Sequence, residues 1–244
     1  MGGVPSCASQ IAGVSPLHPG KVSMVAILFG SISTIADTSE VQRRAFNMAF
    51  TAHGLDWHWS RDEYASMLGS NGGRQRIDGY AAARGNRVDS AAIHETKSQL
   101  FQELLAASAA SPRPGVVDTV RAAQQAGYKL GFVTTTSPGN VRAVLAAASP
   151  DITAETFDLI VTADSVRLAK PDPAAYEFAL TELGEEAANA VAIEDNAGGV
   201  VAASAAGIRC VAFPNANTAG GDFGPAIATV AVLDPSVFRS LLAQ

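Results

Sequence analysis

The sequence is poor in charge and contains no long apolar run, and these two shortages exclude two classes of partner. Charged residues make up only 16% of the 244 residues, and 17 Lys and Arg face 23 Asp and Glu, which gives a net charge of −6. A general nucleic-acid binder presents a dense basic face, so we expect no nucleic-acid partner. No stretch approaches the ~20 apolar residues that span a bilayer, so we expect no membrane partner either.

Cysteine is scarce, and the two in the chain are Cys7 and Cys210. Cysteines so far apart in the sequence form neither a disulfide framework nor a zinc site, and the apolar surroundings of Cys210 are typical of a buried free thiol. The first 23 residues lack the charged start and long apolar core of a secretory signal, and we interpret them as a flexible extension. A cytoplasmic location is therefore the default expectation, with an organellar stroma as the alternative.

Hydrophobic residues make up 48% of the chain, enough for a substantial core, and short apolar runs alternate with helical patterns. This alternation is typical of a parallel sheet covered by helices on both faces. We therefore predict an α/β fold with a Rossmann-like, doubly wound parallel sheet. The predicted strands are 25–29, 128–133, 157–162, 190–193 and 208–213, and the predicted helices between them are 114–125, 140–148, 173–183 and 197–206.

Residues 37–113 break this rhythm, because they hold no strand-like run. Helical patterns fit 40–52, 61–68, 74–83 and 91–107, and in the last of these Ile93, Leu100, Leu104 and Leu105 share one face at a period of 3.6 residues. We predict an inserted all-helical cap. The expected division is an extension at 1–23, a core at 24–36 and 114–244 that ends in a short helix at 234–242, and a cap at 37–113.

Polar side chains follow the predicted strands at the points where they end. Hydroxyl residues follow the first and second strands, Lys170 lies in a loop beyond the third, and Glu194 and Asp195 follow the fourth. In doubly wound sheets the ligand lies beyond the carboxyl ends of the strands. Hydroxyls and an ammonium can bind phosphoryl oxygens, and carboxylates can bind Mg²⁺. The sequence therefore indicates a phosphate and cation site at this edge.

The segments at that edge, residues 29–37, 133–137, 168–173 (LAKPDP) and 193–196 (IEDN), resemble in order and spacing the four motifs of the haloacid dehalogenase superfamily. Within it, DTSEVQRRAFN, HGLDWHWSRDEY, NGGRQRI and VTTTSPGNV resemble the CbbY-type sugar-phosphate phosphatases, whose relatives include β-phosphoglucomutase. The resemblance covers nearly the whole chain from Met24 onward. It implies the same α/β core with a helical cap, and a phosphorylated sugar as the ligand.

The first motif departs from the family pattern. The family reads Phe-Asp-x-Asp-Gly-Thr-Leu, in which the first Asp is the nucleophile and a Mg²⁺ ligand and the second is the general acid/base. This chain has Gly30 and Ile32 at those two places. Glycine offers no attacking oxygen, and isoleucine has nothing to titrate. We therefore predict that phosphoaspartyl catalysis is absent and that the chain is an inactive or severely impaired relative.

An active hydrolase with an altered mechanism is the alternative. Ser31, Ser33 and Thr34 supply hydroxyls near the right place, but a serine nucleophile needs an adjacent general base, and no histidine follows nearby in the sequence. A polar turn is the simpler interpretation of these residues.

The other three motifs keep their binding residues. The resemblance implies that Thr134 binds a phosphoryl oxygen through its hydroxyl and Thr135 through its backbone N–H. It also implies that Lys170 neutralises phosphate charge. Glu194 and Asp195 match the metal acids, but with one carboxylate missing at position 30 we expect weak Mg²⁺ binding. The alternative is that Lys170 pairs with Asp195 and no metal binds.

In the predicted cap, the resemblance places Gly73, Arg74 and Arg76 in the loop that contacts substrate in CbbY-type relatives. Glycine lets the backbone approach a ligand, and two arginines separated by one residue can bind phosphate oxygens together. The alternative is a helix N-terminus with surface arginines. Asp37 matches an acidic position at the cap hinge, and helix capping is its alternative role. The expected partner is a sugar phosphate or, alternatively, a protein.

Overall fold

The computed structural model describes residues 25–69, 72–108, 110–236 and 238. Within them, a six-stranded parallel sheet has the order β3-β2-β1-β4-β5-β6, so the first strand lies inside the sheet. The strands are β1 (Ala26–Phe29), β2 (Lys129–Val133), β3 (Leu159–Val161), β4 (Ala190–Glu194), β5 (Arg209–Ala212) and β6 (Ala228–Thr229). This arrangement confirms the predicted fold class, a Rossmann-like α/β parallel sheet.

All five predicted strands are confirmed to within two residues at each end. β1 and β4 are buried along their whole length, as expected for inner strands of a parallel sheet covered on both faces. The sixth strand has no counterpart among the predictions. It has two residues and no apolar run, and it pairs with β5 at the edge of the sheet.

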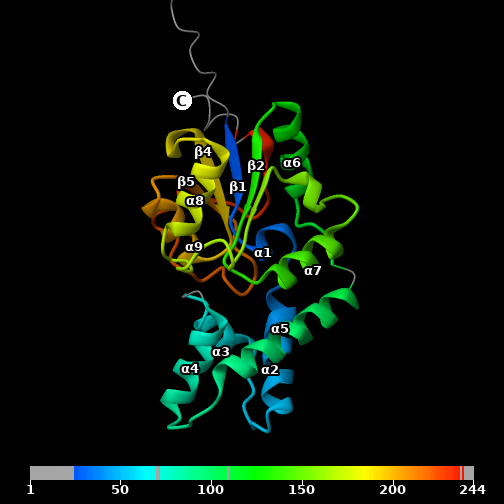
Figure 1. The fold of residues 1–244 in the computed structure, drawn as a ribbon, viewed down its shortest axis with the longest axis vertical. Helices are drawn as coiled ribbons and strands as arrows, with labels where there is room; N and C mark the ends of the chain where they lie inside the picture. The colour runs from blue at the N-terminus through cyan, green and yellow to red at the C-terminus, as the bar shows by residue number, and fades with distance from the viewer. Residues whose placement is uncertain (1–24, 70–71, 109, 237, 239–244) are drawn as a thin grey trace, which may run out of the picture.

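Helices cover both faces of the sheet (Figure 1). α6 (Val116–Gln125) and α7 (Pro138–Ala148) bury their apolar residues in one layer, and α8 (Ala174–Leu183) and α9 (Ala197–Ala205) bury theirs in the other. These four helices match the predicted ones closely. Cys210 is a buried free thiol in the second layer, as predicted.

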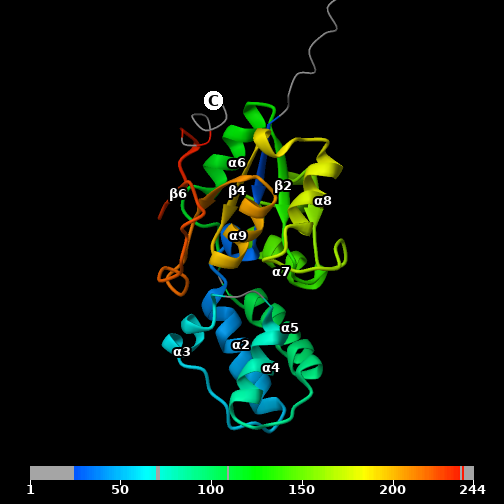
Figure 2. The same cartoon turned by 90° about the vertical axis from the view of Figure 1, so that its left-hand side faces the viewer.

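The helices α2 (Ser39–Ala52), α3 (Arg61–Ser66), α4 (Gly73–Ala83) and α5 (Ser90–Ala106) lie together beyond the edge at which β1 ends (Figures 1 and 2). We call them the helical group. Its interior is a cluster of aromatic rings that includes Trp57, Trp59 and Tyr64. The group therefore has an apolar cluster of its own, whereas Ala45 of α2 and Phe101 and Leu105 of α5 belong to one of the two layers against the sheet.

Helix α5 turns a different face to the interior from the predicted one. Its buried stripe contains Ile93, Lys97, Phe101 and Leu105, whereas the other two predicted leucines are only partly buried. The predicted face is therefore partly wrong, because a lysine and an aromatic residue complete the stripe at a spacing of four residues.

Two chain crossings join the helical group to the sheet, and Ala36 and Pro112 pair there as an isolated antiparallel bridge. The guanidinium of Arg113 donates hydrogen bonds to the carbonyl oxygens of Ser33, Phe213 and Pro214. The predicted domain boundaries flank this crossing and remain predictions. The predicted extension at 1–23 and most of the predicted helix at 234–242 lie outside the described residues.

Candidate functional site

The carboxyl ends of β1 and β4 meet the loop that carries Lys170, as the sequence predicts. The N–H of Gly30 donates to the carbonyl oxygen of Ile193 at 2.8 Å, which places position 30 directly beside the end of β4. A Cβ built on Gly30 would lie 2.2 Å from Glu194 Oε1 and 2.3 Å from Tyr176 Oη. The space beside Gly30 is therefore filled by side chains from β4 and α8.

The side chain of Ile32 joins the apolar layer under the sheet instead of facing a polar site. It is buried in a cluster with Ile35 and Phe29, and it opens the short helix α1 (Ile32–Ile35) after the N-cap residue Ser31. Neither Gly30 nor Ile32 brings a nucleophilic or titratable group to the edge.

Lys170 uses all three of its N–H donors inside the protein. It donates to the backbone carbonyl oxygens of Gly30 and Val133, and to Glu194 Oε1 at 2.6 Å. The predicted alternative, a pair between Lys170 and Asp195, is wrong in its partner, because the lysine pairs with Glu194. The phosphate-binding role of Lys170 stays a prediction, and a phosphate would have to displace one of these acceptors.

Glu194 is completely buried. Its Oε1 atom accepts hydrogen bonds from Lys170 and from Tyr176 Oη at 2.8 Å, whereas Oε2 has no partner among the described residues. Burial raises the pKa of Glu194, and the charge of Lys170 opposes that shift. Burial also raises the pKa of Tyr176 well above its usual value. Nothing in the sequence distinguishes Tyr176 from an ordinary core tyrosine of an apolar helix.

Asp195 lies in a separate set of hydrogen bonds. Its Oδ1 accepts from Ser31 Oγ at 2.5 Å and from Asn196 Nδ2 at 2.9 Å, and its Oδ2 accepts from Asn215 Nδ2 at 3.0 Å. The two adjacent acids thus have different partners. Asn215 is missing from the predicted site, although it follows the fifth predicted strand at the same edge and that position could have identified it.

The segment after β2 is the part of the edge with spare donors. Thr134 is buried, and its Oγ1 accepts from the N–H of Thr136 at 3.2 Å. Within the described residues, no acceptor takes the Thr134 hydroxyl proton and no partner takes the N–H of Thr135. The phosphate-binding roles predicted for both residues remain predictions, and these unpaired donors are what such roles require.

The predicted substrate loop forms the start of α4. Arg74 is exposed and donates to Ser90 Oγ at 3.3 Å, and Arg76 donates to the carbonyl oxygen of Met67 at 3.1 Å. A Cβ on Gly73 would lie 2.7 Å from His94 Nε2, so the chain approaches that ring closely. Contact of Gly73, Arg74 and Arg76 with a substrate stays a prediction.

The carboxylate of Asp37 takes part in the first turn of α2. It accepts from the N–H of Ser39 at 3.1 Å and from Ser39 Oγ at 2.7 Å. The N-cap residue of α2 is Thr38, whose side chain makes no capping bond, so Asp37 binds the first helical N–H from the position before the cap and is not itself the N-cap. Substrate contact by Asp37 stays a prediction.

The sequence prediction omits Lys97, a buried cation in the helical group. Its Nζ donates to Gln42 Oε1 at 3.1 Å and lies 4.8 Å from the centre of the Phe46 ring and 5.1 Å from that of Phe101. Burial, and then the charge of Arg76, lower the pKa of Lys97 to about 7. Its sequence position could have identified it, because Lys97 falls on the same helix face as the apolar residues Ile93, Phe101 and Leu105 of α5.

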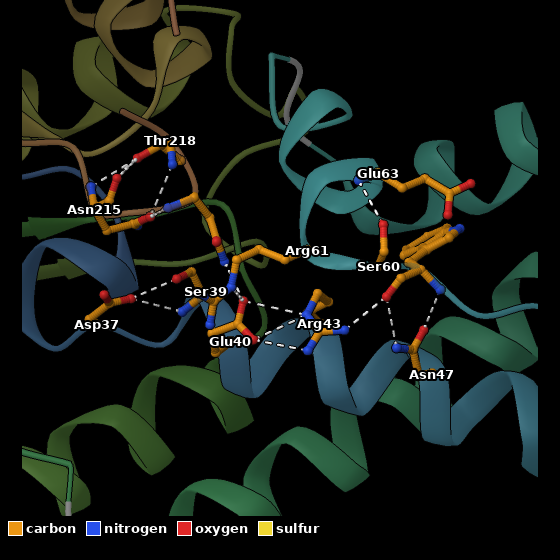
Figure 3. Close-up of polar contacts among 12 residues, drawn as sticks. Asp37, Ser39, Glu40, Arg43, Asn47, Ser60, Arg61, Glu63, Asn215 and Thr218 are labelled. Atoms are coloured by element: carbon orange, nitrogen blue, oxygen red, sulfur yellow. Dashed lines mark hydrogen bonds and ion pairs between the residues drawn. The ribbon is translucent and has the colours of Figure 1, made fainter. Parts of the chain in front are cut away.

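A polar contact joins the helical group to the sheet side of the site (Figure 3). Glu40, in the first turn of α2, accepts from Asn217 Nδ2 at 2.9 Å and also pairs with Arg43 and Arg61. Asn217 belongs to the same loop as Asn215, which binds Asp195. The position of the helical group is thereby connected to one of the two site acids.

Acid is expected to weaken this contact by protonating Glu40. Burial opposes ionisation of the Glu40 carboxyl, but hydrogen bonds from Arg43, Asn217 and Arg61 outweigh burial and lower its pKa from 4.5 to about 2. A carboxyl with a lowered pKa stabilises the fold above its unfolded pKa and loses that contribution as the pH falls. Because the Glu40 side chain is 35% exposed, solvent screening limits the loss to about 1 kcal/mol.

Chemical unfolding of the parent and of Glu40→Gln at several pH values between 4.5 and 2 measures this contribution. The parent should lose about 1 kcal/mol more than Glu40→Gln, which cannot titrate. Asp37→Asn, at a neighbouring exposed carboxylate, is the control and should follow the parent. Parallel pH profiles for the parent and Glu40→Gln would contradict the prediction.

Known proteins resemble this chain in sequence and in overall fold. The family model for haloacid dehalogenase-like hydrolases matches residues 24–207. Protein CbbY of Cereibacter sphaeroides is 40% identical over 206 residues, which cover 82% of this chain and 89% of that protein. The crystal structure of CbbY from Rhodobacter sphaeroides in complex with phosphate superposes with a TM-score of 0.79 and 38% identity, over 86% of this chain and 94% of that one. A mutant of that protein, similar to the same extent, has been solved in complex with xylulose-(1,5)bisphosphate.

Proposed function

The chain belongs to the haloacid dehalogenase-like hydrolase family, with relatives of the CbbY type, and on that premise we propose that it binds a phosphorylated sugar between the helical group and the carboxyl edge of the sheet. We also propose that it does so without phosphoaspartyl catalysis. One observation carries the second part: the edge after β1 offers Gly30 and buried Ile32 where the family motif has two aspartates.

These two positions matter because the family reaction runs through a covalent intermediate on a carboxylate. Loss of such a nucleophile costs on the order of 10⁴–10⁶ in rate. The backbone carbonyl of Gly30 and the alkyl chain of Ile32 cannot attack phosphorus or transfer a proton at neutral pH. Binding of a ligand therefore does not lead to its hydrolysis by the family route.

The ligand class comes from the relatives. The complexes of the Rhodobacter sphaeroides protein hold phosphate and xylulose-(1,5)bisphosphate. In this chain, the spare donors of Thr134 and Thr135 can bind one phosphate group, and Arg74 and Arg76 can bind a second group of the same ligand. Lys170 connects the ends of β1 and β2, because its ammonium donates to the carbonyl oxygens of Gly30 and Val133.

Location and other partners remain part of the proposal. No helix in the described ranges is long and apolar enough to cross a membrane. Two expectations stay predictions from the sequence. One is a cytoplasmic location, and the other is a protein partner for a chain that binds phosphate without catalysis.

Ligand binding without turnover is the expected result. Xylulose-(1,5)bisphosphate at about 100 times its dissociation constant should stabilise the protein by ~2.7 kcal/mol, which raises the melting temperature by about 5–10 °C. Arg74→Ala and Arg76→Ala should reduce this shift, whereas Arg87→Ala, an exposed arginine between α4 and α5, should leave it unchanged. Release of phosphate by the parent at about 1 s⁻¹ or more, a typical enzyme rate, would refute the absence of catalysis.

One contact favours a second candidate, a hydrolase with a serine nucleophile. Ser31 Oγ donates to Asp195 Oδ1 at 2.5 Å, so a carboxylate stands where a serine nucleophile needs a general base. In such a step Ser31 Oγ forms a bond to phosphorus, the bond from phosphorus to the sugar oxygen breaks, and the serine proton moves to Asp195. The sugar oxygen takes a proton from water, the hydroxide so formed attacks phosphorus and breaks the phosphoserine bond, and Asp195 returns its proton to Ser31 Oγ.

Intact-mass measurement during incubation with the sugar phosphate distinguishes the two candidates. The serine route requires a parent protein heavier by one phosphoryl group, and it requires that Ser31→Ala abolish both the added mass and the turnover. A parent that binds the ligand, gains no mass and releases no phosphate supports binding alone.

A further inference from the structure

The carboxylate of Glu194 lies between two glycines that leave room for it. A Cβ on Gly199 would lie 2.1 Å from Glu194 Cδ, and a Cβ on Gly30 would lie 2.2 Å from Glu194 Oε1. Both distances are far below van der Waals contact, so neither position can carry a side chain while Glu194 keeps this place. The missing side chain at position 30 and the inward position of Glu194 are therefore parts of one arrangement.

The charge of Glu194 is balanced inside that space. Lys170 and Tyr176 both donate to Oε1, and the lysine ammonium lies 4.3 Å from the centre of the Tyr176 ring. The side chains of Lys170 and Glu194 are 3% and 0% exposed. A buried ion pair of this kind persists when each charge has its partner and additional hydrogen bonds. The pair is neutral as it stands and needs no further cation for its charge.

We propose that Glu194 occupies the place of the missing carboxylate at position 30 and acts as the structural counter-ion of Lys170, so that this centre does not take Mg²⁺. This role depends on the residues around the pair alone. It holds whether or not a phosphorylated sugar binds at the edge.

The other groups at the edge do not make up a magnesium site. Within the ranges that the structure describes, no cluster of three or more His, Cys, Asp and Glu side chains is placed to hold a metal ion. Asp195 is the remaining acid, and its two oxygens already accept three hydrogen bonds. Oε2 of Glu194 is unpaired, but it lies against Gly199, at 2.2 Å from a Cβ built there. Mg²⁺ usually binds through one or two accessible carboxylates, with waters completing its octahedral shell. Here Asp195 is buried and hydrogen-bonded, and the free oxygen of Glu194 is enclosed, so neither acid offers an accessible oxygen.

Position 30 is where a counter-ion role for Glu194 can be tested by substitution. A carboxylate introduced there would overlap Glu194 and would add a second negative charge beside it. Glu194 would then have to move outward. The repulsion between the two neighbouring carboxylates is reduced when a divalent cation binds between them. The Gly30→Asp variant should therefore acquire a response to Mg²⁺ that the parent lacks, whereas Gly30→Ala should suffer the overlap without acquiring the response.

Melting temperatures with millimolar MgCl₂, with NaCl at equal ionic strength, and with a chelator test this set of variants. The parent should show no Mg²⁺-specific shift. Gly30→Ala and Gly30→Asp should both melt several degrees lower than the parent, by about 5–10 °C, and Mg²⁺ should raise the melting temperature of Gly30→Asp alone. A Mg²⁺-specific rise in the parent that is lost in Glu194→Gln would overturn the proposal.

Direct titration with Mn²⁺, followed by its electron paramagnetic resonance signal, covers the case in which Gly30→Asp does not fold. The folded parent should leave the Mn²⁺ free at millimolar concentration, and Glu194→Gln should behave in the same way. Bound Mn²⁺ in the parent, displaced by Mg²⁺ and weakened by Glu194→Gln, would assign Glu194 to a metal and refute the counter-ion role. Binding of a sugar phosphate is measured separately, so either outcome leaves the proposed function to its own test.

Discussion

Replacing Gly30 and Ile32 together by aspartate is expected to give the protein a Mg²⁺-dependent phosphatase activity at least about 10³-fold above that of the parent. A covalent nucleophile contributes on the order of 10⁴–10⁶ in rate, and a general acid/base contributes about 10²–10⁴, with strong overlap between the two. Under the proposed function, the donors of Thr134 and Thr135 at the edge hold the phosphate. The variant therefore adds the two missing catalytic groups, and Asp at position 30 also supplies a second carboxylate for Mg²⁺.

Full recovery of a family-like rate is not expected. Ile32 lies in an apolar cluster and is 7% exposed, so a carboxylate in its place incurs a desolvation cost until the helix α1 adjusts. Ser33 stands where the family motif has glycine, and Glu194 must leave the space beside position 30. Each of these costs lowers the rate, but hydrolysis through the introduced aspartate remains possible.

Phosphate release from xylulose-(1,5)bisphosphate, with and without Mg²⁺, measures the gain. The pair Gly30→Asn with Ile32→Asn is the matched control, because it has the same shape and no carboxylate, and it should remain as inactive as the parent. Gly30→Asp alone should be partly active, and Ile32→Asp alone should be inactive. Equal activity in the aspartate and asparagine pairs would show that the introduced carboxylates do not act as nucleophile and acid/base.

Most of the fold could be predicted from the sequence because its strands are short apolar runs buried on both faces. Such runs, as at β1 and β4, differ from the helical patterns between them in both length and period. The weak edge strand β6 carries no such signal, because two residues have no period and their pairing depends on the neighbouring β5. The buried face of α5 is also predicted only in part. A lysine is not expected in a core because of its charge, yet Lys97 is buried and completes the buried face of this helix.

The position of Lys170, Glu194 and Asp195 at one edge of the sheet could be predicted, but not their pairing. Glu194 is the last residue of β4 and Asp195 follows it, and successive residues of an extended chain point to opposite sides. Which of the two meets Lys170 therefore depends on the side from which the loop after β3 approaches, and no local pattern encodes that. The inward position of Glu194 depends in turn on Gly30 and Gly199, which are 169 positions apart by numbering but adjoin the same carboxylate.

Replacing Lys170 by methionine is expected to lower the free energy of unfolding by about 3–5 kcal/mol, because it leaves a buried carboxylate without its partner. Methionine is an unbranched side chain that lacks only the terminal ammonium position of lysine, so the loss reports the charge and its hydrogen bonds more than a cavity. The carbonyl oxygens of Gly30 and Val133 also lose their donor, which adds to the cost. Urea unfolding followed by far-ultraviolet circular dichroism measures the change.

Arg121→Met is the control for this loss. Arg121 pairs with Asp151 at 3.6 Å, and both side chains are largely exposed, at 62% and 49%, against 3% and 0% for Lys170 and Glu194. Water can replace either partner of the exposed pair, so Arg121→Met should cost at most about 1 kcal/mol. A loss of equal size in both variants would mean that burial of the Lys170–Glu194 pair does not increase its contribution to stability.

A double-mutant cycle separates the pair from its surroundings. Glu194→Gln alone should also destabilise, because it leaves the ammonium of Lys170 buried beside a neutral amide, whereas Lys170→Met with Glu194→Gln removes both charges at once. The double variant should therefore be more stable than the sum of the two single losses predicts, with a coupling of about 1–3 kcal/mol. Strict additivity would show that each residue stabilises the fold independently, and it would leave the counter-ion role of Glu194 without its energetic basis.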